Sequence, residues 1–266
     1  MAGQGHVVPM LSPAALLVQR YDPDRFFTAL FAPPAAREAL FTLYAVNHEL
    51  ARAREAVSNP LAALIRLQWW REVAEGARPR HEVATPLGDA LDRGALDAGD
   101  ILAMIEGREA EADPIETEDA FRAYVCAIAG GVAVAAGRAL GAEGTALDAL
   151  RDLGSAYGIA GILRSVPALA RQGRCVLPAD ALVAAGSSVE EVAATGVLPS
   201  LVRDRVAAMG SAWLVEGRRS RLPRTAIAAA LPAALTRRDL KRPGEIRARG
   251  LGDRVAVVAA AIRGRV

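Results

Sequence analysis

The sequence DLGSAYGIAGILRSVP occupies residues 152–167, near the middle of the chain. Its apolar residues recur every three or four positions, which predicts a helix, although Gly154, Gly158 and Gly161 interrupt it. A glycine inside a helix costs about 1 kcal/mol relative to alanine, so a neighbour must approach this backbone closely. A packed helix or a bound ligand would explain the pattern, and helix packing is the simpler interpretation. The spacing is not that of a phosphate loop, because no strand precedes it and no Gly-Lys-Ser/Thr follows.

The same periodicity extends along almost the whole chain, and alternating β-branched runs are missing. We therefore predict an all-α fold with one helical domain at residues 20–240, an N-terminal extension at 1–19 and a basic tail at 241–266. Proline, glycine and polar clusters separate the expected helices. These helices cover about 33–57, 60–76, 85–112, 117–140, 145–170, 179–185, 188–194, 198–218 and 225–238, with a short apolar helix in the tail at 255–262.

The composition is that of a globular protein. Of 266 residues, 52% are hydrophobic and 23% are charged, and the net charge is +2, which excludes a disordered chain, a collagen and a disulfide scaffold. Cys126 and Cys175 lack Cys-x-x-Cys spacing, so neither a disulfide nor a zinc site is predicted. Three histidines are too few for a multi-histidine metal site, and we predict no bound metal.

No targeting or membrane-spanning segment is expected from the sequence. The N-terminal residues have no basic stretch followed by an apolar core, so they do not resemble a secretory signal. After the first 19 residues, the longest uncharged run, Ala123 to Gly137, has fifteen residues, fewer than the roughly 20 that cross a bilayer. A cytoplasmic location is therefore favoured.

Charge is distributed unevenly along the chain. From Arg218 to Val266 there are 13 Lys and Arg against three acids, whereas the preceding residues carry 19 basic and 27 acidic side chains. Such a region suits an anionic membrane, where each basic residue adds up to about 1 kcal/mol, or an acidic partner; a solvated helical face is the alternative. We expect peripheral attachment at the inner face of the membrane. Nucleic acid is not expected as a partner, because the region has no aromatic residue for base stacking.

Several motifs together resemble the squalene/phytoene synthases, a family of all-α enzymes that join two prenyl diphosphates head to head. The resemblance covers about residues 20–185. It rests on Arg25-Phe26-Phe27, Leu43-Tyr44-Ala45, Arg66-Leu67-Gln68-Trp69-Trp70-Arg71, Tyr124-Val125-Cys126, Gly161-Ile162-Leu163-Arg164 and Gly173-Arg174-Cys175-Val176-Leu177-Pro178. It implies a single-domain helical bundle of the isoprenoid synthase type with a central cavity.

The sequence departs from this family where its active members hold magnesium. Their two aspartate-rich motifs align with Ala51 and Glu55 on one helix and with Ser165 and Leu169 on another. Magnesium takes oxygen ligands, and ionising an allylic diphosphate needs metal to neutralise the leaving group. The resemblance therefore implies that both metal-binding motifs are lost, and no cofactor is expected.

These departures resemble a divergent branch of the family that includes mitochondrial complex I assembly factor 6 and its bacterial relatives. The segments that fit are Asn47-His48-Glu49-Leu50-Ala51, Ala56-Val57-Ser58, Arg108-Glu109, Gly158-Ile159 and Leu163-Arg164-Ser165-Val166-Pro167. The resemblance implies a helical protein, without demonstrated prenyl transfer, that assists the assembly of a respiratory complex. A subunit of such a complex is thus an expected partner.

The implied cavity gives a set of candidate residues. We expect Arg52, Arg54, Arg164 and Arg174 at its mouth, where guanidinium groups bind an anionic head group of a lipid or prenyl ligand without metal. Ion pairs of these arginines with Glu49, Glu55 and Asp152 are the structural alternative. The expected cavity-lining residues are Tyr44, Asn47, His48, Gln68, Trp69, Tyr157 and Gly161.

The sequence leaves two other functions open. An active, magnesium-dependent prenyl transferase would use relocated acids such as Glu49, Glu55, Asp152 or Glu111. A pure interaction scaffold would have a filled core and no ligand. The periodicity cannot distinguish these, because cavity-lining and core residues share the same spacing.

Overall fold

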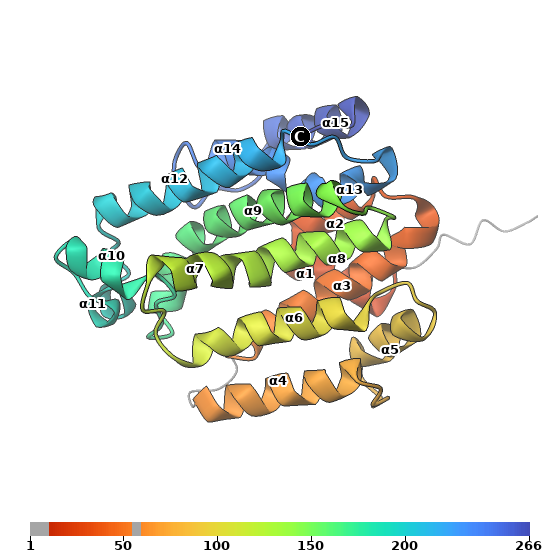
Figure 1. The fold of residues 1–266 in the computed structure, drawn as a ribbon, viewed down its shortest axis with the longest axis horizontal. Helices are drawn as coiled ribbons and strands as arrows, with labels where there is room; N and C mark the ends of the chain where they lie inside the picture. The colour runs from red at the N-terminus through yellow and green to blue at the C-terminus, as the bar shows by residue number, and fades with distance from the viewer. Residues whose placement is uncertain (1–10, 55–59) are drawn as a thin grey trace, which may run out of the picture.

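The computed structural model describes residues 11–54 and 60–266. Helices form every regular element in these ranges, which confirms the all-α prediction (Figure 1). The elements are α1 (Pro13–Tyr21), α2 (Pro23–Ala29), α3 (Pro34–Arg52), α4 (Pro60–Ala74), α5 (Ala84–Asp92), α6 (Ala98–Glu109), η1 (Ala110–Ala112), α7 (Glu118–Val125), η2 (Cys126–Gly130), α8 (Gly131–Ala139), α9 (Thr145–Ala170), α10 (Ala179–Ala184), α11 (Val189–Thr195), α12 (Ser200–Gly217), η3 (Arg224–Ala226), α13 (Ile227–Ala230), α14 (Ala233–Asp239) and α15 (Leu251–Arg263).

Helix α9 lies at the centre of the bundle and packs against α8, α12 and the single π-helical turn η2. A Cβ atom at Gly154 would lie 2.5 Å from the Cβ of Ala133, and one at Gly158 would lie 2.4 Å from that of Ala129. Such distances are shorter than van der Waals contact, so these two glycines are required by helix packing. At Gly161 a Cβ atom would meet no atom within 4 Å, and this glycine faces open space instead.

Two of the expected helices are broken. The predicted segment 85–112 is two helices, because Gly94 adopts a left-handed φ of 65° and Asp97 caps the start of α6. The segment 225–238 is interrupted before Ala233, where Pro232 lacks the amide that would continue the helix. The sequence also gave no separate prediction for α1 and α2, each of which begins at a proline capped by a preceding side chain.

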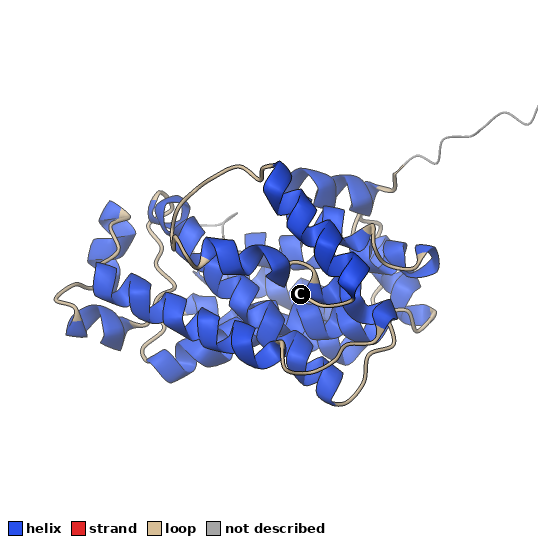
Figure 2. Ribbon diagram, turned by 90° about the horizontal axis from the view of Figure 1, so that it is seen from above, coloured by secondary structure: helices blue, strands red, loops and turns tan. Residues whose placement is uncertain are grey.

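The remaining helices cover this centre in layers. In Figure 1, α6 lies between the central helices and α4, while α12, α14 and α15 lie on the opposite side. Figure 2 shows the bundle from above, with the chain end marked on the face that α15 occupies. The described part of the expected extension, from residue 11, and the expected tail both pack into the body, since α1 contacts α3 and α15 contacts α14.

Two stretches have the length and composition of membrane spans. Residues Glu118–Ala139 and Thr145–Ala170 reach mean hydropathies of 1.6 and 1.2, and 67% and 50% of these windows are buried inside the bundle. They are the central elements against which the other helices pack, and their apolar character matches this role.

Candidate functional site

A cavity of about 600 Å³ opens between the central helices and the C-terminal segment. The α1–α2 junction, α3, η2 and α9 supply most of its wall, and residues 247–249 of the segment before α15 also reach it. Its charged lining residues are six arginines and three acids: Arg25, Arg108, Arg164, Arg174, Arg247, Arg249, Asp22, Asp24 and Glu111. The lining itself therefore carries more positive than negative charge, while Asp239 and Asp253, which lie outside the lining, pair with Arg164, Arg247 and Arg249.

Glu111 is enclosed by two of these arginines. Its carboxylate accepts from Arg108 at 2.7 Å, from the Tyr124 hydroxyl at 2.8 Å and from Arg174. Burial opposes its charge, but Arg108 and Arg174 outweigh burial, and the pKa of Glu111 is lowered. Burial and the charge of Glu111 raise the pKa of Tyr124, so the phenol remains a neutral donor.

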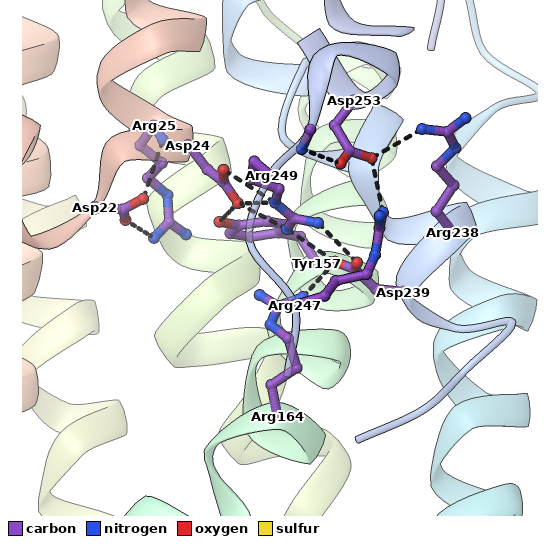
Figure 3. Close-up of polar contacts among 11 residues, drawn as sticks. Asp22, Asp24, Arg25, Tyr157, Arg164, Arg238, Asp239, Arg247, Arg249 and Asp253 are labelled. Carbon is purple, nitrogen blue, oxygen red and sulfur yellow. Dashed lines mark hydrogen bonds and ion pairs between the residues drawn. The ribbon is translucent and has the colours of Figure 1, made fainter. Parts of the chain in front are cut away.

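A second network joins the C-terminal segment to α2 and α14 (Figure 3). The Arg249 guanidinium donates to Asp24 at 2.8 Å and 3.0 Å and to Asp239 at 2.8 Å and 2.9 Å. Arg164 also donates to Asp239, and the Tyr157 hydroxyl donates to Asp24 at 3.3 Å. Both carboxylates are thus held by arginine, and Arg249 links α2 to α14.

Asp22 and Arg25 form the third charged group. Asp22 caps α2 by accepting from the Arg25 amide at 3.0 Å, and it also binds the Arg25 guanidinium at 2.9 Å. This guanidinium lies over the rings of Tyr157 and Tyr44, at 5.1 Å and 5.6 Å from their centroids. Burial raises the pKa of Tyr44 to about 12, so Tyr44 supports Arg25 as a neutral ring.

The four arginines expected at the mouth divide into two pairs. Arg164 and Arg174 line the cavity, whereas Arg52 and Arg54 do not. Arg52 is partly exposed and lies 3.9 Å from Glu49, as the ion-pair alternative predicted. Arg54 lies in a separate small pocket between α3 and α4, beside Leu64 and Leu67.

Some of the residues predicted to line the cavity do so and others do not. Asn47, Tyr157 and Gly161 line the cavity, and Tyr44 lies behind Tyr157 against Arg25. His48 stacks on the lining residue Tyr21, with ring centroids 4.5 Å apart.

The prediction that Gln68 and Trp69 line the cavity is wrong. Both lie on α4, which packs against α5 and α6. Gln68 is exposed, and Trp69 packs edge-on against Trp70 and His81. Helix α6 separates α4 from the central helices, so these side chains cannot reach the cavity.

The positions aligned with the family's aspartates converge on this cavity. Ala51 from α3 and Ser165 and Leu169 from α9 all line it. The Ser165 hydroxyl donates to the carbonyl of Ile162 at 2.9 Å within its own helix. The fourth position, Glu55, lies outside the described residues.

Among the relocated acids considered from sequence, only Glu111 reaches this cavity within the described ranges. Glu49 is buried on α3 near Arg52, outside the lining. Asp152 lies beside Gly217 of α12, and its pKa is raised by burial and by the nearby Glu216. Across residues 11–54 and 60–266, no group of three or more His, Cys, Asp or Glu side chains is placed to hold a metal ion.

Sequence reasoning did not identify Asp24, Asp239 and Arg249 as site residues. Their contacts join positions 225 residues apart for Arg249 with Asp24 and 75 apart for Arg164 with Asp239. Helical periodicity reports neighbours within a few turns and carries no signal for such pairs. The cluster Asp22-Pro23-Asp24-Arg25 was a usable signal, because two acids beside an arginine at a helix start are unlike the apolar sequence around them.

Comparison with known proteins gives a consistent picture. The family model described as squalene/phytoene synthase matches residues 18–257. Complex I assembly factor 6 of NADH dehydrogenase (ubiquinone) is 28% identical in Rattus norvegicus and 27% identical in Homo sapiens, over 186 residues in each. These matches cover 66% of this chain and 55% of the relatives, so the chain spans about half the length of the curated relatives it matches.

Solved structures share the fold. A dehydrosqualene synthase crystallised in complex with ligand superposes with a TM-score of 0.75 at 16% identity, over 94% of each chain. The squalene synthase HpnC from Alicyclobacillus acidocaldarius gives a TM-score of 0.64 at 18% identity, over 94% of this chain and 92% of that one. At these identities the likeness establishes the arrangement of helices, which is that of the isoprenoid synthases.

Proposed function

Because this chain belongs to the squalene/phytoene synthase family, we propose that it uses the family's helical cavity to bind an anionic lipid or prenyl compound without metal. The observation that carries the proposal is the wall of the cavity, where six arginines face three acids. Guanidinium groups bind phosphate oxygens through paired donors, and partly buried sites strengthen this attraction. Ile128, Ile162 and Val176 add apolar surface for a hydrocarbon chain.

The cavity does not suit the magnesium ions of a prenyl transferase. Its acids Asp22, Asp24 and Glu111 are each bound to at least one arginine. Recruiting these carboxylates to a cation would leave buried guanidinium groups unpaired, which is costly. Of the four positions aligned with the aspartate motifs, Ala51 and Leu169 have no side-chain oxygen and Ser165 has a hydroxyl, while Glu55, the one carboxylate, lies outside the described residues. We therefore derive no metal-dependent step.

Lipid content of the purified full-length chain tests the ligand proposal. Extraction and mass spectrometry should identify an anionic lipid or prenyl compound bound to the wild type. Gly161→Leu should lose it, because the new side chain enters the open space beside α9. Gly161→Ala, which adds one methyl group at the same site, is the matched control and should retain the ligand. A chain that carries no such compound, and binds none after delipidation, would contradict the proposal.

A turnover assay distinguishes metal-free ligand binding from the alternative, an active prenyl transferase. The protein is incubated with farnesyl or geranylgeranyl diphosphate and magnesium, and released diphosphate is measured. We expect no release above the rate without protein. Magnesium-dependent release that Glu55→Ala or Glu111→Gln abolishes would establish the enzyme and overturn the metal-free proposal.

We also propose that the chain assists the assembly of a respiratory complex of the complex I type. The similarity to the named assembly factors supports this role, although it covers about half of their length. Deleting the gene in the native cell should lower the amount of assembled NADH dehydrogenase complex, and the wild-type gene should restore it. Normal assembly in the deletion strain would refute this role while leaving ligand binding intact.

A further inference from the structure

The C-terminal helix α15 exposes an apolar stripe on its outer side. Leu251, Val255, Val258 and Ile262 are 79%, 56%, 37% and 72% exposed. With about 100° between successive residues, these four side chains fall on one line along the helix. A surface helix ordinarily places polar residues on this side, so the stripe is an apolar face that no described part of the chain covers.

The stripe belongs to a helix that is held firmly in place. Its opposite side buries Val257 and Ala260 in the core, and α15 packs against α14. Near its start, the buried Asp253 accepts from Arg238 at 3.0 Å and from Arg247 at 2.8 Å (Figure 3). The outward direction of the stripe is therefore fixed by packing and by ion pairs.

A basic groove of about 530 Å³ runs beside the stripe, between α12, α14 and α15. Its floor is mostly alanine, and no acidic residue lines it in the described chain. The cationic lining residues are Arg218, Arg237, Arg238, Lys241, Arg263 and Arg265. A second groove of about 400 Å³ shares three of these residues and adds Arg219, Arg221 and Arg224.

Several of these cations are available to an external anion. Within the described ranges, Arg237, Lys241 and Arg263 form no ion pair. Arg218 donates to a main-chain oxygen of Val266 at 2.8 Å. The grooves therefore present a concentrated positive potential, which attracts anionic groups.

The groove and the stripe share α15. The helix contributes Ala256, Ala259, Ala260 and Arg263 to the groove; Ala259 and Arg263 lie about 70° and about 110° around the helix from the middle of the stripe, and the other two lie further round. A flat surface that touches the stripe would thus lie alongside the cations of the groove. Apolar residues at the level of acyl chains, with cations beside them at the level of phosphates, are the arrangement of a helix that lies in a membrane interface.

We propose that this face docks on an anionic membrane, with the stripe of α15 inserted among the acyl chains and the groove cations bound to lipid phosphates. The inference uses a different face from the central cavity and does not depend on the proposed function. A second copy of the chain is a poorer occupant, because a symmetric contact would bring the same uncompensated cations together. A phospholipid bilayer matches both the apolar stripe and the charge.

Vesicle flotation with the full chain tests this surface. The protein should float with vesicles that contain phosphatidylglycerol, far less with phosphatidylcholine alone, and less again at high salt. Val255→Ser with Ile262→Ser should weaken binding to the anionic vesicles by about tenfold or more. Val183→Ser with Val197→Ser, which changes two equally exposed residues near the opposite end of the bundle, is the matched control and should bind normally.

The charge component is tested separately. Arg237→Gln with Lys241→Gln should weaken the same binding by about tenfold or more, whereas Arg66→Gln with Arg93→Gln should not. All substituted side chains are partly or fully exposed, and thermal melts of each variant establish that it is folded. Failure of the wild type to float, or equal binding by the stripe variant and its control, would overturn the proposal. Dimerisation that only the stripe variant loses would assign the face to a second copy instead.

Discussion

Arg249 and Asp24 lie 225 positions apart, yet the Arg249 guanidinium donates to Asp24 through Nε at 3.0 Å and through Nη2 at 2.8 Å. The same guanidinium binds Asp239 with its remaining donors. One side chain therefore joins the segment before α15 to α2 and to α14, and it also lines the cavity. The C-terminal segment is part of the cavity wall, and the integrity of the cavity depends on it.

Replacing Arg249 by glutamine should destabilise the fold. The change leaves two mostly buried carboxylates without their shared cation, which costs about 3 kcal/mol. Urea unfolding at neutral pH measures this loss. Arg242→Gln, in the same segment, removes an exposed pair with Glu245 and should change the free energy of unfolding by less than about 0.5 kcal/mol. Equal effects of the two changes would mean that Arg249 does not hold the segment.

Two glycines of α9 should respond in opposite directions to alanine. Gly158→Ala should destabilise by about 1–3 kcal/mol, because its Cβ would overlap that of Ala129. Gly161→Ala should stabilise by up to about 1 kcal/mol, because the methyl group enters open space and helix propensity improves. Chemical unfolding of both variants checks the prediction, which fails if the two changes have the same sign.

Asp253 should make the stability of the fold depend on pH. Burial opposes its charge, but the Gly250 amide, Arg238 and Arg247 outweigh burial and lower its pKa to about 2. Since the unfolded pKa is higher, near 4, the ionised carboxylate stabilises the fold above that pH by about 2 kcal/mol, and this contribution is lost as pH falls to 2.

The advantage of the wild type over Asp253→Asn should therefore be full at pH 7 and shrink between pH 4 and pH 2. Unfolding curves of both proteins across this range measure the difference. An advantage that stays constant down to pH 2 would show that the pKa of Asp253 is not lowered.

The substitution Glu111→Gln should distinguish a cavity that binds an anion through its arginines from one in which Glu111 itself binds metal or takes part in catalysis. Removing this acid leaves Arg108 and Arg174 without their partner, so stability should fall by about 3 kcal/mol while the cavity becomes more positive. Affinity for an anionic amphiphile should therefore rise. Glu106→Gln, on an exposed side chain of α6, is the control for the loss of one negative charge. A catalytic or metal-binding role of Glu111 predicts the opposite, a loss of ligand affinity.

Much of the fold was predictable because helical periodicity is local. The family was predicted from short motifs and is confirmed by the family model, and the predicted resemblance to complex I assembly factor 6 is confirmed by the similarity to those proteins. The central helix 145–170 was predicted with its observed bounds, and its glycines were correctly linked to packing at Gly154 and Gly158. Prediction failed at 85–112 and 225–238, where single turns at Gly94 and Pro232 divide continuous apolar patterns.

The candidate site was predicted less completely. The motif resemblance led us to expect Arg164 and Arg174 at the cavity, which they line. Their carboxylate partners, Asp239 and Glu111, come from distant segments of the chain and were not predicted as their partners. Arg249 lies in a stretch whose high positive charge favoured an exposed tail, whereas ion pairs keep it mostly buried. Which distant charges pair depends on how the helices fold back on one another. A single sequence carries little information about that arrangement.

Calorimetric titration of the delipidated protein with farnesyl diphosphate, in magnesium and in EDTA, tests the central claim most directly. If arginines bind the head group, the affinity should be the same in both buffers and should be lost in Gly161→Leu but kept in Gly161→Ala. Binding that requires magnesium, or no binding in either buffer, would contradict a metal-free anion site in this cavity.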